Sequence, residues 1–457
     1  MIFAVWRINM IEQDKQKFNM SPPQLIMLIF VLLIFTASIL LSLPISAAEG
    51  VTISWLDALF TATSAVCVNG LVVIDTGTSF SMFGQVIILF LIQIGGIGFM
   101  TFGVLVAIIL GKRIGLRERL FMQQTTQSHS IKGVVRLSWY IIFIALSFEA
   151  IAAIILTLRW ITDMGFGRAL YYGIFHSISA FNNAGFALWS DSLSSYINDP
   201  IVNLTIVVLF VLGGLGFMVI IDIFQKRSWR NFSLHTKIVL ISSGSLLVIG
   251  FLLLLLLESW NVATFGELSW SERLSAAFFQ SATPRSAGFN TIDIGNMLSS
   301  SQLILIILMF IGASSGGTGG GIKTNTFVVL LLATFNTFRG GGPIHVFHRR
   351  IAIDTVMRAL AVVISSIACV FIVALLLTIT EGMLEKQFLE VLFEATSAFS
   401  TTGLSMGLTR ELTPIGKIIV ALTMFIGRLG PLTLAYALAK KNRTTKINYP
   451  EDHVLIG

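Results

Sequence analysis

Charged residues and cysteines are both scarce in this chain of 457 residues, and each scarcity excludes a class of protein. Asp, Glu, Lys and Arg make up 12% of the residues, about half the share found in soluble domains. Hydrophobic residues make up 55%, and the mean hydropathy is +0.87. Cys67 and Cys369 are too few for a disulfide framework or a cysteine metal cluster, and the six histidines show no metal-ligand spacing. The composition therefore predicts a membrane protein.

Apolar runs of about 20 residues, enough for a helix to cross a hydrocarbon layer ~30 Å thick, recur along the chain. The first run follows a polar leader and has no clear cleavage site, so we expect it to be retained rather than removed as a signal peptide. We predict eight membrane spans, near residues 22–44, 79–110, 137–158, 199–225, 236–257, 301–338, 355–379 and 412–439.

The distribution of charge along the chain predicts the orientation of these spans. Lys and Arg concentrate in the loops after the second, fourth and sixth spans, and such residues are retained in short cytoplasmic loops. We therefore expect a multi-pass protein of the cell membrane with both termini in the cytoplasm. Acidic residues dominate the opposite loops and should concentrate cations there. Because topology accounts for the net charge of +7, we predict no nucleic-acid partner.

Four short glycine loops recur at nearly equal intervals. Their last glycines, Gly70, Gly185, Gly288 and Gly403, are 115, 103 and 115 residues apart. Repetition at a fixed period indicates one structural unit used four times. The candidate ion-binding residues of these loops are Val68, Asn69, Gly70, Asn183, Ala184, Gly185, Ser286, Ala287, Gly288, Thr401, Thr402 and Gly403.

A similar short segment precedes each loop. It carries an aromatic residue ten positions before the glycine and a small residue six positions before it, namely Phe60, Phe175, Phe278 and Phe393, and Ser64, Ser179, Ala282 and Ser397. A segment of roughly ten residues cannot span the bilayer. Irregular backbone at membrane depth is stable only where protein or a watery cavity covers it. Each unit is therefore expected to form a re-entrant hairpin.

These features predict an all-α membrane protein with four pseudo-symmetric repeats around one central pore. Each repeat would contain a transmembrane helix, a re-entrant pore helix with its glycine loop, and a second transmembrane helix. The predicted segments are a cytoplasmic N-terminal segment at 1–20, repeats at 21–111, 112–228, 229–340 (with a broken second helix) and 341–440, and a cytoplasmic tail at 441–457.

Glycine suits such loops for a steric reason. To aim successive carbonyl oxygens at one axis, the backbone must adopt positive φ angles, which glycine tolerates and residues with a Cβ disfavour. A ring of four loops could then replace the water around a cation without a carboxylate, and it could release the ion again. The alternative is four structural hairpins with no conduction path.

A second run of glycines interrupts the sixth span. Six glycines in ten residues weaken a helix by roughly 1 kcal/mol each relative to Ala, so the span should break ~16 Å from its start. Ile322 separates the glycines from Lys323 and no strand precedes them, which excludes a phosphate-binding loop. We interpret the run as a mobile plug; a structural break for helix packing is the alternative. The candidate gate residues are Gly312, Ser314, Ser315, Gly316, Gly317, Thr318, Gly319, Gly320, Gly321, Lys323 and Arg428.

Arg428 belongs to this set because of its position in the fourth repeat. Gly427 follows Gly403 by 24 residues, as Gly312 follows Gly288, so Arg428 should lie level with the glycine run. An arginine at membrane depth normally faces protein or water. We expect it to hold carbonyls of the run and repel passing cations; the alternative is a packing role with a carboxylate partner.

Other polar residues within or near the spans also invite interpretation. Arg285 and Glu394 are predicted to form a structural ion pair. Glu149 is a candidate proton or Na⁺ site, although pairing with a backbone or hydroxyl group inside the bundle is favoured. Asp222, followed by Lys226 and Arg227, is expected to form an interfacial cluster. No constellation of nucleophile, base and metal ligand is present, so no catalytic residue is predicted.

The chain resembles the Trk/Ktr/HKT superfamily of potassium transporters, most closely the Ktr membrane subunit. The motifs that carry the resemblance are Ser21-Pro22-Pro23-Gln24, Thr283-Pro284-Arg285-Ser286-Ala287-Gly288-Phe289 and Thr396-Ser397-Ala398-Phe399-Ser400-Thr401-Thr402-Gly403. The resemblance implies K⁺ uptake by a homodimer regulated by a cytosolic RCK-type nucleotide-binding ring. In this superfamily a Ser in place of the first glycine accompanies Na⁺ permeation, and Gly70 stands there, which favours K⁺.

The expected function is therefore potassium uptake across the cytoplasmic membrane, through a four-loop carbonyl selectivity filter gated by the glycine run. The alternative is a Na⁺- or H⁺-coupled potassium symporter. K⁺ is the expected transported ion, Na⁺ a candidate activator, and no organic cofactor is expected on this chain. One glycine per loop predicts looser rejection of Na⁺. Candidate docking residues for the regulatory ring are Arg113, Arg117, Arg119, Arg227 and Arg230.

Overall fold

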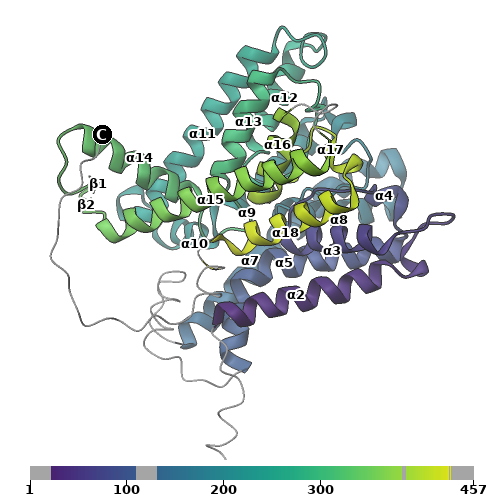
Figure 1. Cartoon of the computed structure of the whole chain (residues 1–457), viewed down its shortest axis with the longest axis horizontal. Helices are drawn as coiled ribbons and strands as arrows, with labels where there is room; N and C mark the ends of the chain where they lie inside the picture. Colours follow the sequence, from purple (N-terminus) through teal and green to yellow (C-terminus); the bar gives the residue numbers. More distant parts are fainter. Residues whose placement is uncertain (1–21, 110–130, 383–387, 432, 434–457) are drawn as a thin grey trace, which may run out of the picture.

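The computed structural model describes residues 22–109, 131–382, 388–431 and 433, and within them the chain is almost entirely helical (Figure 1). A two-stranded hairpin, β1 (His345–Val346) and β2 (Arg349–Arg350), is antiparallel. The helices are α2 (Pro22–Leu41), η2 (Pro44–Ser46), α3 (Trp55–Cys67), α4 (Thr76–Ser79), α5 (Met82–Ile109), α7 (Ile131–Met164), α8 (Phe166–Phe181), η3 (Ser194–Tyr196), α9 (Pro200–Leu215), α10 (Phe217–Lys226), η4 (Trp229–Asn231), α11 (Leu234–Glu258), α12 (Trp270–Ala282), α13 (Ser299–Ile311), α14 (Thr324–Phe338), α15 (Ile353–Thr380), α16 (Phe388–Ser400), α17 (Leu408–Glu411) and α18 (Pro414–Leu429).

The same order of elements occurs four times. A long helix, a short helix, a glycine loop and a second helix follow one another as α2-α3-α5, α7-α8-α9/α10, α11-α12-α13/α14 and α15-α16-α18. The short helix α3 of the first repeat packs against α18 of the fourth, so the ends of the described chain lie together and close the bundle. The predicted all-α fold of four repeats is confirmed.

Two of the predicted spans are broken. The four long helices α2, α7, α11 and α15 each contain enough apolar residues to cross a bilayer. The sixth predicted span ends its first helix at Ile311 and resumes at Thr324, as expected. The fourth breaks as well, because α9 and α10 meet at Gly216 with a bend of 93°. That second break was not predicted, and its signal in the sequence was the three glycines Gly213, Gly214 and Gly216.

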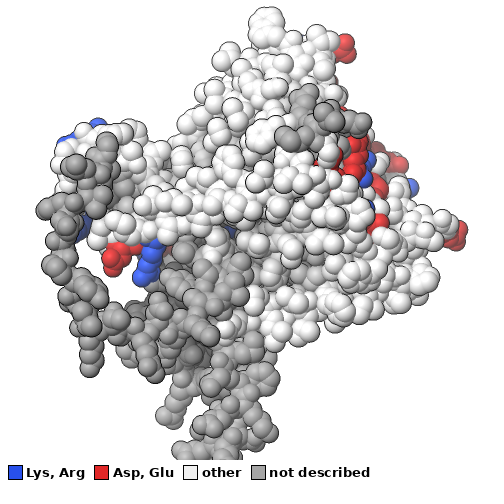
Figure 2. Space-filling view, in the orientation of Figure 1, with Lys and Arg blue, Asp and Glu red and all other residues white. Residues whose placement is uncertain are grey.

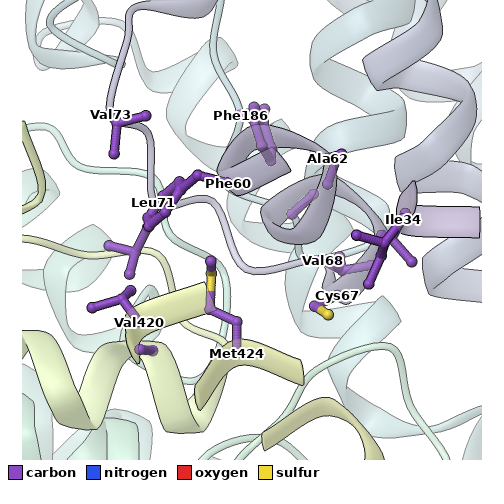
Figure 3. Close-up of a cluster of buried hydrophobic side chains, with 14 of the residues drawn as sticks. Ile34, Phe60, Ala62, Cys67, Val68, Leu71, Val73, Phe186, Val420 and Met424 are labelled. Carbon is purple, nitrogen blue, oxygen red and sulfur yellow. The ribbon is translucent and has the colours of Figure 1, made fainter. Parts of the chain in front are cut away.

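Aromatic side chains anchor the short helices in the core. Phe60, Phe175 and Phe393 are fully or almost fully buried. In the third repeat the expected Phe278 is half-buried and the adjacent Phe279 is buried in its place. Figure 3 shows Val420 and Met424 of α18 pointing toward the segment that carries Leu71, within one apolar cluster. The first glycine loop is thus held from the side by the last repeat.

On the face shown in Figure 2, the broad middle is mostly white, and acidic residues gather near α4 and α17. Lys417 of α18 pairs with Asp57 of α3 at 2.6 Å, and both side chains are partly buried. This ion pair joins the fourth repeat to the first. Asp222 pairs with Lys226 at 2.6 Å, which confirms this contact of the predicted cluster.

Three repeats share a close contact between their second long helix and the end of their short helix. A methyl group added at Gly95, Gly213 or Gly427 would lie 2.1, 1.9 or 1.9 Å from the carbonyl oxygen of Val66, Phe181 or Phe399 respectively. Each of these carbonyls belongs to the residue four positions before the loop glycine. In the third repeat, Gly312 instead meets the carbonyl of Gly320, 2.3 Å away by the same measure.

We expect Gly427→Ala to destabilise the folded protein, because the added methyl displaces backbone rather than a flexible side chain. Overpacking of this kind costs roughly 1–3 kcal/mol. The loss is measured as a lower midpoint of thermal aggregation in detergent. Gly244→Ala is the matched control, since Gly244 of α11 has open space around its Cα and Ala is the better helix former. Equal midpoints for the two variants would contradict the packing argument.

Candidate functional site

The four glycine loops meet around one axis. A methyl group added at Gly70 would lie 2.5 Å from the carbonyl oxygen of Ala184, and one at Gly185 would lie 2.8 Å from Cα of Gly288. A methyl group added at Gly288 would lie 2.5 Å from the carbonyl oxygen of Thr402, and one added at Gly403 would lie 2.2 Å from the carbonyl oxygen of Asn69. The contacts run from the first loop through the second, third and fourth and back to the first. Backbone therefore packs directly on backbone around a closed ring.

The backbone of all four loops adopts positive φ angles, which residues with a Cβ disfavour. Gly70, Gly185, Gly288 and Gly403 have φ angles of 96°, 69°, 80° and 87°. The residue two positions earlier also has positive φ in every repeat, although none is glycine: Val68 54°, Asn183 60°, Ser286 76° and Thr401 47°. A left-handed residue with a Cβ costs about 1–2 kcal/mol. Four such residues at equivalent positions indicate a conformation that the surrounding packing imposes.

Hydrogen bonds from the short helices fix the loops. Gly70 donates its backbone N–H to Ser64 Oγ at 3.1 Å, and Ser179 Oγ donates to the carbonyl of Phe186 at 2.7 Å. Between repeats, Asn69 Nδ2 donates to the carbonyl of Ala398 at 3.1 Å. In the first two repeats, the serine six positions before the loop glycine thus holds the loop through a hydrogen bond to its backbone.

A cavity of about 410 Å³ lies against one side of the ring, and all four loop glycines line it. Asp75, Asp191 and Asp293 line the same cavity, together with Arg410, which donates to the carbonyl of Ser190 at 3.3 Å. Three carboxylates against one guanidinium make this vestibule attractive to cations. The predicted acidic mouth is therefore built over the ring itself.

The glycine run between α13 and α14 lies against the ring from another side. Thr318 is fully buried, and its Oγ1 lies 3.2 Å from Asn183 Oδ1 and 3.3 Å from the carbonyl of Phe181. The run contacts the break at Gly216, because the backbone N–H of Phe217 donates to the carbonyl of Gly316 at 3.0 Å. Two broken helices, from the second and third repeats, thus bind each other at membrane depth.

Two basic side chains hold this run. Arg428 donates through Nη1 to the carbonyl of Thr318, and through Nη2 to the carbonyl of Gly95 at 2.5 Å. Lys323 donates to the carbonyl of Gly319. Arg428 is 7% exposed, which places a guanidinium in the interior of the bundle between the first, third and fourth repeats. The sequence prediction put Arg428 level with the run, and the structure brings them into contact.

Ser286 connects the run to the ring. Its Oγ accepts the backbone N–H of Gly320 at 2.8 Å and donates to the carbonyl of Thr401 at 2.7 Å. One hydroxyl thus touches the third loop, the fourth loop and the glycine run. A displacement of the run would remove a partner from a residue of the ring. This coupling was not foreseen from the sequence, because it depends on side-chain direction.

The predicted ion pair of Arg285 with Glu394 is wrong. Arg285 donates to Ser243, at 2.8 Å to Oγ and 3.3 Å to the backbone oxygen, because α11 passes closer to it than α16 does. Glu394 accepts from Ser405 at 2.8 Å and from Thr409. Glu149 binds the side-chain amides of two residues rather than a backbone or hydroxyl group.

Several predictions concern the chain ends and the cytoplasmic face. The terminal segments 1–20 and 441–457, and Arg113, Arg117 and Arg119, lie outside the described residues. Arg227 and Arg230 are exposed, as are His345 and His348. Cys67 is buried and Cys369 is partly buried, and both are free thiols. The repeat boundaries, docking residues and the roles assigned to ring and run stay predictions.

Known proteins resemble this chain along most of its length. The family model described as TrkH, cation transport protein, matches residues 10–448. The Ktr system potassium uptake protein B of Bacillus subtilis (strain 168) is 46% identical and covers 96% of this chain and 97% of its own length. The potassium/sodium uptake protein NtpJ of Enterococcus hirae is 36% identical, and the match covers 96% of this chain and 98% of that protein. The crystal structure of TrkH from Vibrio parahaemolyticus matches the fold with a TM-score of 0.71 at 20% identity. The match covers 93% of this chain and 86% of the TrkH chain.

Proposed function

Because the chain belongs to the TrkH family of cation transport proteins, we propose that it takes up potassium across a cell membrane through the ring of four glycine loops. It is a multi-pass membrane transporter and not an enzyme. Relatives named for potassium uptake match nearly the whole chain. The proposal that K⁺ is the transported ion is therefore supported by similarity across all four repeats and not by one motif alone.

The observation that carries the proposal is the closed contact ring of the loop backbones. Backbone oxygens of Asn69, Ala184 and Thr402 lie at the contacts between neighbouring loops, and none of the twelve loop residues carries a carboxylate. Such oxygens can take over part of the hydration shell of K⁺ and still release the ion. The acidic vestibule would supply cations to the ring, and the membrane potential would drive inward movement at ~2.3 kcal/mol per charge per 100 mV.

The glycine run is proposed as the gate of this pathway. It contacts the ring through Thr318 and Ser286, and it is held by Arg428 and Lys323. Glycines give the run few side chains that could anchor it, so it is held by the two cations, a few hydroxyl groups and backbone hydrogen bonds to Gly213, Gly214 and Phe217. Deleting residues 314–319 should remove the block and raise basal flux.

The test is ⁸⁶Rb⁺ uptake into liposomes that contain the purified chain, with an imposed membrane potential. We expect uptake that unlabelled K⁺ inhibits and that persists when Na⁺ is absent from both sides. Liposomes without protein are the control. Uptake that disappears without a Na⁺ gradient would instead support the coupled symporter, a possibility raised by the relative named for potassium and sodium uptake. No protein-dependent uptake under any gradient would refute both.

A homodimer and a cytosolic RCK-type ring are proposed as partners on the strength of the family resemblance. Arg227 lies just before η4 (Trp229–Asn231) and Arg230 lies within it; both are exposed and available for contact with another subunit. Charge reversal of both should weaken binding of an added regulatory ring in pull-down experiments. Unchanged binding would assign these residues to membrane topology alone.

A further inference from the structure

A buried carboxylate lies directly behind the second glycine loop. Glu149 is on α7, within a membrane-spanning helix, and is 4% exposed. Its Oε2 accepts from Gln93 Nε2 of α5 at 2.9 Å, and its Oε1 accepts from Asn182 Nδ2 at 3.0 Å. Asn182 immediately precedes Asn183, the first residue of the loop. Glu149 thus contacts the neighbour of the proposed ion-binding backbone.

Among the described residues, the neighbours of Glu149 offer no compensating charge. The elements packed against α7 here are α5, α8 and α9. The polar groups that face the carboxylate from the described part of these helices are the neutral amides of Gln93 and Asn182, and Phe148 beside it stacks on Phe181 of α8. None of the ion pairs among the described residues includes Glu149. An unpaired carboxylate in a membrane interior is costly when ionised and is relieved by a bound cation or proton.

The amide cluster around Glu149 has one hydrogen-bond donor fewer than its acceptors require. Asn182 Nδ2 lies within 2.7 Å of Gln93 Oε1, 3.0 Å of Glu149 Oε1 and 2.9 Å of the carbonyl of Ile178. A side-chain amide has two hydrogens, so one of these three oxygens receives none. Asn182 Oδ1, which is fully buried, has no hydrogen-bond partner among the described residues and packs against Gly96 of α5, whose added methyl would lie 2.0 Å away. A proton on the carboxyl group would supply the missing donor.

We propose that Glu149 is a proton-binding site whose occupancy lowers the affinity of the adjacent loop for its cation, an inference that rests on the proposed transport function. The reaction is simple: the carboxylate takes up one H⁺ and becomes a neutral carboxylic acid. Ionised, it places a negative charge next to the second loop and attracts a cation in the ring. Protonated, it loses that charge and can donate to the amide cluster, which changes how Asn182 is held.

The coupling must act in both directions. If a proton on Glu149 weakens K⁺ binding, then K⁺ in the ring must weaken proton binding by the same factor. The affinity contributed by the ionised form is present at high pH and is lost as the pH falls through the range in which Glu149 becomes protonated. Acidification should therefore weaken cation binding, and added K⁺ should shift protonation of Glu149 to lower pH.

The first test measures ⁸⁶Rb⁺ uptake as a function of Rb⁺ concentration and pH in liposomes. In the wild-type protein the apparent affinity for Rb⁺ should fall about fivefold or more on acidification, the lower end of typical couplings between sites. Glu149→Gln, neutral at every pH, should bind Rb⁺ weakly throughout and show a flat profile, whereas Glu149→Asp should keep a pH dependence. A wild-type profile in Glu149→Gln would overturn the proposal.

Glu258→Gln is the matched control, because it removes an equally buried carboxylate elsewhere. Glu258 ends α11 and accepts from Asn261 at 2.8 Å, Thr264 at 2.6 Å and the backbone of Leu298 at 2.9 Å. This variant should retain the wild-type dependence on pH. A flat profile here too would assign the effect to general loss of a buried acid and would overturn the specific role of Glu149.

The second test does not depend on transport. Infrared difference spectra of the purified protein should show the C=O stretch of a protonated carboxyl group that titrates with pH, shifts on addition of K⁺ and is absent in Glu149→Gln. A titrating band without Rb⁺ uptake in the wild-type protein would refute the transport function but keep the proton site. Uptake without any such band would refute the proton site alone. The two inferences can thus fail separately.

Discussion

Gly403→Ala is expected to lower ⁸⁶Rb⁺ uptake at least about a hundredfold while leaving the helices in place. The φ angle of 87° already disfavours a residue with a Cβ. The added methyl would also lie 2.2 Å from the carbonyl oxygen of Asn69 and 2.9 Å from Cα of Gly70. Both obstacles are backbone atoms of the first loop. Relief therefore requires the ring itself to open, which moves the oxygens that would hold the ion.

The control for this variant lies in the same segment. Gly407 has a φ of 109° and no atom within 4 Å of an added methyl. Gly407→Ala therefore introduces similar backbone strain without the collision, and we expect near wild-type uptake. If both variants lose uptake equally, local strain and not the ring is responsible. If Gly403→Ala transports normally, the four loops do not form the pathway.

The same contact argues that the four loops depend on one another. Each loop glycine packs on the backbone of the next repeat, so a displacement in one loop reaches its neighbour without any flexible side chain between them. The non-glycine residues with positive φ add to this dependence, because Val68, Asn183 and Thr401 keep that conformation only under the surrounding packing. Ring geometry is thus a property of the assembled bundle and not of one repeat.

This dependence explains what sequence could and could not predict. The loop glycines, the short helices and the break at Gly312 follow from spacing, apolar length and helix propensity, all of which are local. The break at Gly216 was missed, since three glycines in an apolar run are also common where helices pack closely. The left-handed Val68 was missed because nothing in a valine indicates positive φ. The partner of Arg285 was wrong because it depended on which helix of another repeat passed nearby.

Arg428→Ala is the second variant for which we expect a large effect, a rise in basal ⁸⁶Rb⁺ flux of about tenfold or more. Arg428 bonds the carbonyls of Thr318 and Gly95, and a hydrogen bond to a charged group contributes about 1.5–3 kcal/mol. Losing even one such bond from the closed state shifts the balance toward the open state by at least tenfold. Removing the cation also removes electrostatic repulsion from the pathway.

Lys417→Ala distinguishes release of the gate from general weakening of α18. Lys417 is on the same helix and is also a partly buried cation, but it binds Asp57 of α3 at 2.6 Å and does not bond the glycine run. We expect it to lower the thermal midpoint without raising flux. Lys323 still binds Gly319 in Arg428→Ala, so the double variant with Lys323→Ala should leak more than either alone. Unchanged or lower flux in folded Arg428→Ala would mean that the run lies beside the pathway and only supports the packing of broken helices, because a plug that loses its main anchor must block less.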